Sequence, residues 1–132
     1  MGKDYLSILE DRLDRKGYEK LMAIENPHLH KFIAKYLDLC DPESVFVSDG
    51  SEEDQRYIRE AAIRNGEEIP LAMKGHTVHF DGYYDQARDR ENTKILVPPG
   101  VSLGENIRTM DREKGLKEIH EIMKGIMKGH EC

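Results

Sequence analysis

The residues best suited to chemistry lie in one polar stretch, residues 81–94, which contains the pair Tyr83 and Tyr84 and two arginines, Arg88 and Arg90. A guanidinium group can form two parallel hydrogen bonds to a carboxylate or a phosphate, so either arginine could bind an anionic substrate. Their acidic neighbours are Asp85, Asp89 and Glu91. These acids favour a solvated, charge-balanced turn. The residues alone therefore predict a loop, with anion binding as one hypothesis.

Histidine spacing could indicate a metal site, because the six histidines include the pairs His28-x-His30 and His76-x-x-His79. Residues three apart on a strand point to opposite faces, and residues two apart on a helix do not share a face. Neither pair can chelate one ion in regular structure. The sequence therefore predicts no metal site in this chain.

Nucleotide binding and nucleophilic catalysis are also unsupported. A phosphate-binding loop needs a glycine-rich turn ending in Gly-Lys-Ser/Thr, and the one Gly-Lys pair, Gly2-Lys3, is followed by Asp4. Residues 47–53 have a strand–turn–helix layout, but three acids follow at once and would repel a phosphate. Cys40 lies on an apolar helix face, which predicts a buried structural thiol. We therefore expect no catalytic residue and no cofactor in this chain.

Four elements are predicted in the first half of the chain. Asp4 can cap a helix with apolar residues at helical spacing, for which Gly17 is the expected end. Asn26-Pro27 predicts the start of a helix over residues 27–40, which ends before Asp41-Pro42. The β-branched run 44–48 predicts a buried strand. Ser51 can cap the next helix, with Asp54 in the position of a capping-box acid, and Asn65-Gly66 ends it.

The second half predicts three strands, over residues 69–73, 76–80 and 94–97, and a final helix that Asp111 caps and Gly129 ends. Its apolar stripe is Leu116, Ile119, Ile122, Met123, Ile126 and Met127. The order predicts an α/β fold, a mixed sheet with flanking helices and a helical N-terminal segment. We expect one partial domain over 1–132, with helices in 1–41 and the βα unit, strands and last helix in 42–132.

Composition excludes several classes of function. The 132 residues carry 26 acidic and 20 basic side chains, for a net charge of −6, so the basic footprint of a nucleic-acid-binding protein is absent. No apolar run is long enough to cross a bilayer, and the N-terminus lacks the apolar core of a signal peptide, which predicts a cytoplasmic protein. Cys40 and Cys132 have no CxxC spacing, and reduced thiols are expected.

Three stretches resemble the N-terminal part of GTP-dependent phosphoenolpyruvate carboxykinase, in particular its archaeal branch. They are residues 45–53, the loop and strand 81–98, and residues 106–113 with the helix after them, 115–129. The resemblance implies an enzyme of gluconeogenesis that decarboxylates oxaloacetate and phosphorylates the enolate with GTP. The products are phosphoenolpyruvate, GDP and carbon dioxide, and divalent manganese or magnesium assists.

The resemblance also implies a role for one arginine, because family members bind substrate through an Ala-Arg element just before a strand. Ala87-Arg88 matches this element, so Arg88 is the expected substrate-binding residue. An extra residue separates it from Glu91, which makes Arg90 the second candidate.

No residue here matches the family's phosphate loop, metal ligands, reactive cysteine or lid, so residue 132 looks like a truncation. The chain is then an N-terminal substrate lobe that is inactive alone and self-associates through its last helix. The alternative is a short stand-alone module that senses a small dicarboxylate.

Overall fold

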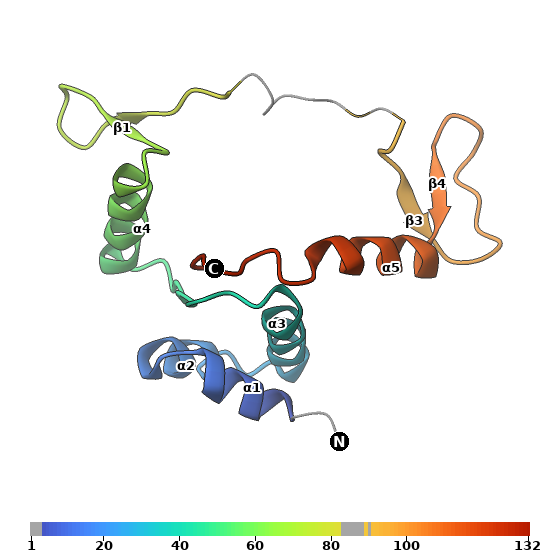
Figure 1. Cartoon of the computed structure of the whole chain (residues 1–132), viewed down its shortest axis with the longest axis horizontal. Helices are drawn as coiled ribbons and strands as arrows, with labels where there is room; N and C mark the ends of the chain where they lie inside the picture. The colour runs from blue at the N-terminus through green and yellow to red at the C-terminus, as the bar shows by residue number, and fades with distance from the viewer. Residues whose placement is uncertain (1–3, 83–88, 90) are drawn as a thin grey trace. The chain divides into compact units, whose positions relative to one another are not determined.

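The computed structural model describes residues 4–82, 89 and 91–132, which belong to two compact units, residues 1–47 with 91–132 and residues 48–90. The elements of the first unit are α1 (Tyr5–Arg12), α2 (Arg15–Met22), α3 (Pro27–Cys40), β3 (Ile95–Val97), β4 (Thr109–Asp111) and α5 (Arg112–Met123), and those of the second are α4 (Glu52–Arg64), β1 (Ile69–Pro70) and β2 (Thr77–Val78) (Figure 1). The predicted α/β class is confirmed, with small sheets in place of one larger sheet.

The N-terminal segment forms two short helices where one was predicted. Leu13 is extended and ends α1, and the Asp14 side chain then accepts a hydrogen bond from the Gly17 N–H at 2.6 Å to cap α2. Gly17, the expected helix end, is therefore wrong as a stop. It is buried inside α2, where a Cβ would lie 3.2 Å from the Val47 side chain.

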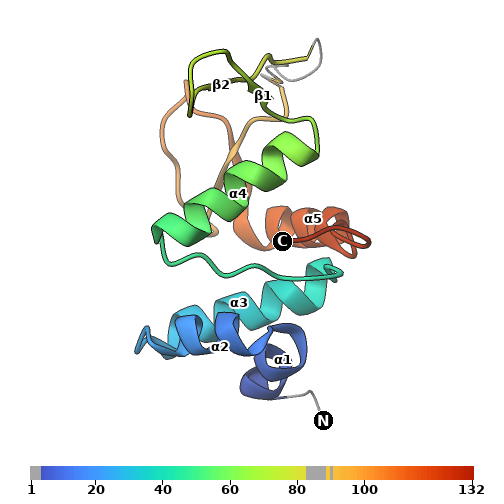
Figure 2. The ribbon, with the colours of Figure 1, turned by 90° about the vertical axis from the view of Figure 1, so that its left-hand side faces the viewer.

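The core of the first unit lies between α1, α2 and α3. In both views of the ribbon α1 and α2 lie on the same side of α3 (Figures 1 and 2). Five buried side chains form this core: Leu9, Leu13, Leu21, Ala34 and Leu37. Leu9 is completely buried, and Val45 and Val47 pack against the cluster from the segment that follows α3.

Helix α3 begins and ends where the sequence predicts. The Asn26 side chain accepts hydrogen bonds from the N–H groups of His28 and Leu29, and Pro27 occupies the first turn. Asp41 ends the helix with a left-handed φ of 52°. Its carboxylate accepts a 2.6 Å hydrogen bond from Arg12, and the Lys128 ammonium lies 3.6 Å from its other oxygen. The Arg12 hydrogen bond is the main reason that the pKa of Asp41 falls below its ordinary value.

The strand predicted over residues 44–48 is not formed. Ser44 makes an isolated parallel bridge with Glu131, and three backbone hydrogen bonds join residues 43–46 to residues 130–132. The partner segment offers too few rungs for a regular strand, so the β-branched run remains extended without being assigned to a sheet.

The predicted strand 94–97 is confirmed as β3, and its partner β4 was missed. The two strands are parallel, with Ile95 opposite Thr109 and Val97 opposite Asp111. β4 leads directly into α5, whose N-terminal cap is Asp111 as predicted. The segment Thr109–Asp111 is short and ends in Asp, a residue that is rare in strands, so the sequence does not predict β4.

Helix α5 ends at Met123, several residues before the predicted end at Gly129. Gly125 adopts a φ of 67° and donates its N–H to the Leu39 carbonyl oxygen, and the Met127 N–H reaches the Cys40 carbonyl oxygen. The chain thus turns onto the C-terminal end of α3. Ile126 and Met127, predicted on the helix, lie beyond it.

In the second unit, α4 has the predicted cap, because the Ser51 side chain accepts from the Asp54 N–H. The buried Asp54 carboxylate accepts a 2.9 Å hydrogen bond from the N–H of Asp49. The predicted strands 69–73 and 76–80 shorten to β1 and β2, which pair antiparallel with Ile69 opposite Val78. Across the described residues of both units, no helix has the length and apolar character needed to span a membrane.

Candidate functional site

The predicted substrate-binding residue Arg88, the second candidate Arg90 and the two tyrosines before them lie outside the described residues. The described part of the candidate site is the frame that receives this stretch: residues 91–94, β3, β4 and α5. This frame shows which hydrogen bonds and packing contacts fix the backbone that follows the two arginines.

Strand β3 is fixed from its first residue. The Ile95 N–H donates to the Arg108 carbonyl oxygen at 2.9 Å, and the strand ends at Val97, which is buried. Only residues 91–94 separate Arg90 from this hydrogen bond. The backbone is therefore held by hydrogen bonds from Ile95 onward.

The same pairing brings two basic residues to one end of the ladder. Lys94 precedes β3 and Arg108 precedes β4, and the Ile95–Arg108 hydrogen bond makes these positions neighbours across the two strands. Both side chains are exposed. Two exposed basic residues thus lie side by side at this end of the ladder, in a chain whose net charge is negative. Sequence reasoning missed Arg108 because the pairing that brings it here depends on the unpredicted strand β4.

Gly115 determines how closely α5 approaches β3. A Cβ at this position would overlap the Leu96 side chain, so any other residue here would require Leu96 or the helix to move. The sequence did carry a signal, because a glycine inside an amphipathic helix costs about 1 kcal/mol relative to alanine and needs a compensating packing reason.

The histidines have individual structural surroundings. His30 is buried, with its Nε2 atom 3.1 Å from the Leu21 carbonyl oxygen, while His28 is exposed. The His79 ring lies 2.8 Å through Nδ1 from the Glu67 carbonyl oxygen and 3.3 Å through Nε2 from the Asp81 carboxylate. Within residues 4–82, 89 and 91–132, no three potential metal-ligating histidine, cysteine or acidic side chains cluster.

The two cysteines are free thiols, and Cys40 is buried, which confirms the structural thiol that the sequence predicts. Cys40 and the exposed Cys132 both line an apolar groove of about 450 Å³ between α3 and the C-terminal segment. The groove contains no charged lining residue, so it suits burial of apolar groups rather than acid–base chemistry.

Comparison with known proteins matches this arrangement to one family. Residues 31–132, which begin within α3 and include the whole β3–β4–α5 frame, match the model of the phosphoenolpyruvate carboxykinase N-terminal domain. The chain belongs to this family.

Individual relatives carry a more specific name. The chain is 59% identical over 129 residues to phosphoenolpyruvate carboxykinase (GTP) of Thermococcus sibiricus, an alignment covering 98% of this chain and 20% of that protein. The protein of the same name from Pyrococcus furiosus is 53% identical over 131 residues, covering 99% and 21%. The one from Saccharolobus solfataricus is 40% identical over 129 residues, covering 98% and 21%. The chain thus spans about a fifth of the length of these relatives, and the resemblance that the sequence indicates is confirmed.

Proposed function

We propose that this chain is the N-terminal substrate lobe of a cytoplasmic phosphoenolpyruvate carboxykinase (GTP), a lyase of gluconeogenesis. The reaction converts oxaloacetate and GTP to phosphoenolpyruvate, GDP and carbon dioxide. The observation that carries this proposal is the 59% identity, over nearly the whole chain, to a protein of that name. The same match favours the substrate lobe over a stand-alone module that senses a dicarboxylate.

Within this lobe, Arg88 binds the substrate. Its guanidinium is suited to a carboxylate of oxaloacetate or to the phosphate of phosphoenolpyruvate. The support is the match of Ala87-Arg88 to the Ala-Arg element that the family resemblance implies, together with the two basic residues Lys94 and Arg108 at the start of the β3–β4 ladder. Arg90 balances the charges of Asp89 and Glu91.

GTP and the divalent manganese or magnesium ion are held by the rest of the longer polypeptide, because this chain has no Gly-Lys-Ser/Thr sequence. The 132-residue chain by itself should therefore neither bind Mg-GTP nor consume oxaloacetate with GTP. Titration calorimetry and a coupled decarboxylation assay measure both. Saturable GTP binding or GTP-dependent turnover by this chain would contradict the assignment of these roles.

The substrate role of Arg88 is tested in the full-length enzyme with two matched variants. Arg88→Ala should raise the transition-state free energy by about 2–5 kcal/mol, the usual cost of removing one partner from a desolvated charge pair. Arg90→Ala should cost less than about 1 kcal/mol, as for an exposed ion pair. The measurement is kcat/KM for oxaloacetate and for phosphoenolpyruvate. A larger loss in Arg90→Ala would move the binding role to Arg90.

The isolated chain should also self-associate through its last helix and the turn after it. Ile122 is 66% exposed and Ile126 is 56% exposed, and a patch of exposed apolar side chains commonly recruits a partner. Light scattering should show oligomers at moderate concentration, and the double variant Ile122→Asp with Ile126→Asp should restore the monomer. A wild-type chain that is monomeric throughout would contradict this proposal.

A further inference from the structure

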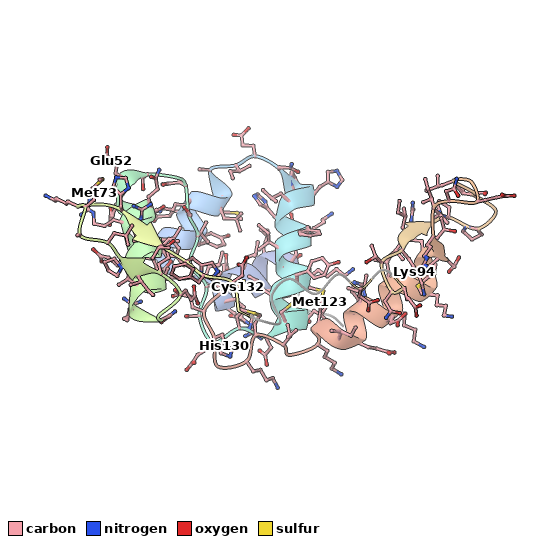
Figure 3. The ribbon with its side chains drawn as sticks, turned by 90° about the horizontal axis from the view of Figure 1, so that it is seen from above. Glu52, Met73, Lys94, Met123, His130 and Cys132 are labelled. Carbon is pink, nitrogen blue, oxygen red and sulfur yellow. The ribbon has the colours of Figure 1, made fainter. Side chains whose placement is uncertain are left out.

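The apolar groove beside α3 is open on one side. Its lining residues are Phe32, Ile33, Tyr36, Leu37, Cys40, Met123, Met127 and Cys132. Figure 3 shows Met123 and Cys132 near the same end of α3, where the chain turns back after α5. Phe32 is 59% exposed although it forms part of this apolar wall. An aromatic side chain so placed is suited to burial by a further segment.

The backbone next to this groove contains the start of a parallel ladder. The Cys132 N–H donates to the Ser44 carbonyl oxygen, and the Phe46 N–H donates to the Cys132 carbonyl oxygen. Together with the Glu43–His130 bond, these contacts set both the direction and the register of the two segments. The side of residues 46–47 beyond this last bond is where a longer partner strand would continue.

We propose that the groove and the backbone edge at residues 46–47, both in the first unit, together form the docking surface for the segment that follows residue 132 in the full-length polypeptide. The relatives are about five times as long as the alignment, so such a segment exists in them. Cys132 belongs to both the groove lining and the ladder, so a strand that continues from it enters this surface directly.

The register makes the proposal specific. In a parallel ladder, the residue two positions after Cys132 donates its N–H to the Phe46 carbonyl oxygen and accepts from the Ser48 N–H. The Val-Phe-Val-Ser sequence, which favours a strand, then becomes one in the full-length protein. A second copy of the chain would have to occupy the space that this continuing backbone enters, so we commit to the intramolecular occupant.

Backbone pairing can be measured in the full-length protein by hydrogen exchange. The Ser48 amide should exchange within about tenfold of the Phe46 amide, which is already in the ladder, because both would open in one cooperative unit. Gly100, in the exposed turn after β3, serves as the reference for an unprotected amide. Ser48 exchange as fast as that of Gly100 would overturn the proposal.

Groove occupancy is tested by a matched pair of substitutions in the same full-length protein. Phe32→Asp should lower the unfolding temperature, because it places a charge against a covered apolar wall, whereas Ile24→Asp should change it much less. Ile24 is a suitable control because it is similarly exposed, at 51%, and does not line the groove. Equal effects of the two variants would overturn the proposal. So would a full-length dimer that Phe32→Asp converts to monomers, since the occupant would then be a second copy.

Discussion

The two ends of the larger unit differ in how much of their apolar surface they bury. The α1–α3 end surrounds Leu9 and Ala34, which are 0% and 1% exposed. In the β3–β4–α5 part, Val97 and Gly115 are the buried positions among the described residues, while Ile119 and Ile122 of α5 are 42% and 66% exposed. One end is a self-contained core, and the other is a frame that leaves several of its apolar side chains exposed to solvent.

This difference shows that apolar periodicity determines where a helix forms, whereas tertiary packing determines how strongly it is stabilised. Both α3 and α5 have apolar residues at helical spacing, and both form helices. Helices α1 and α2 bury Ala34 and Leu37 on one side of α3, whereas Ile119 and Ile122 of α5 remain exposed. An amphipathic sequence thus predicts a helix in both places, but its stabilisation depends on a partner. The candidate substrate loop enters the less self-sufficient end.

The largest expected effect sharpens this comparison with one substitution at each end. Leu9→Ala should lower the free energy of unfolding by about 2–5 kcal/mol, because it removes a fully buried side chain and leaves a cavity. Ile122→Ala should change it by less than about 0.5 kcal/mol, as for an exposed site. Urea denaturation of the 132-residue chain, at a concentration low enough for light scattering to show a monomer, measures both. Similar losses at the two sites would show that α5 is covered in solution and would break the comparison.

The next prediction tests whether α5 packs tightly against β3 at Gly115. Gly115→Ala should lower the free energy of unfolding by about 1–3 kcal/mol, because the new methyl group overlaps the Leu96 side chain. The control is Leu96→Ala, alone and combined with Gly115→Ala, followed by the same denaturant measurement. The combined loss should be smaller than the sum of the single losses, since the smaller side chain makes room. Additive losses would rule out the overlap as the cause.

The smallest effect concerns the ion pair between Arg12, in α1, and Asp41, at the end of α3. Because Arg12 lowers the pKa of Asp41, the pair stabilises the fold above the ordinary pKa of an aspartate and loses this effect as the pH falls through the lowered value. Asp41→Asn keeps a residue that tolerates the left-handed backbone and removes the charge. The stability difference between wild type and Asp41→Asn should shrink on acidification from about pH 6 to about pH 3. A pH-independent difference would contradict this mechanism.

The sequence predicts correctly the helix starts that are stabilised by capping residues next to them in the chain. Asn26-Pro27 and Asp111 fixed two helix starts through side-chain caps, and both caps are present. The errors arose where a distant segment decides the structure. Gly17 is wrong as a helix end because its contact with Val47 cannot be seen in the sequence. Residues 44–48 were predicted as a strand because propensity does not reveal how few rungs the partner supplies.

The candidate site shows the same division. Its arginines were found from residue type and family resemblance, and the frame of β3 and the Asp111 cap could be predicted from the sequence. Arg108 and Gly115 could not be placed, because their positions depend on the β3–β4 pairing and on the depth of the α5 packing. Local sequence patterns do not contain the information on how distant segments pair and pack.

The pairing of Ser44 with Glu131 has a consequence for the order of folding. The two residues are 87 positions apart, so closing this loop costs about 4 kcal/mol of chain entropy by the logarithmic rule. Arg12 and Asp41 are only 29 positions apart, and their loop costs about 3 kcal/mol on the same scale. The three-helix core also gains its buried leucines at once, whereas the ladder gains a few hydrogen bonds. We therefore expect α1–α3 to fold while the remainder is still being synthesised, and the 130–132 segment to dock last.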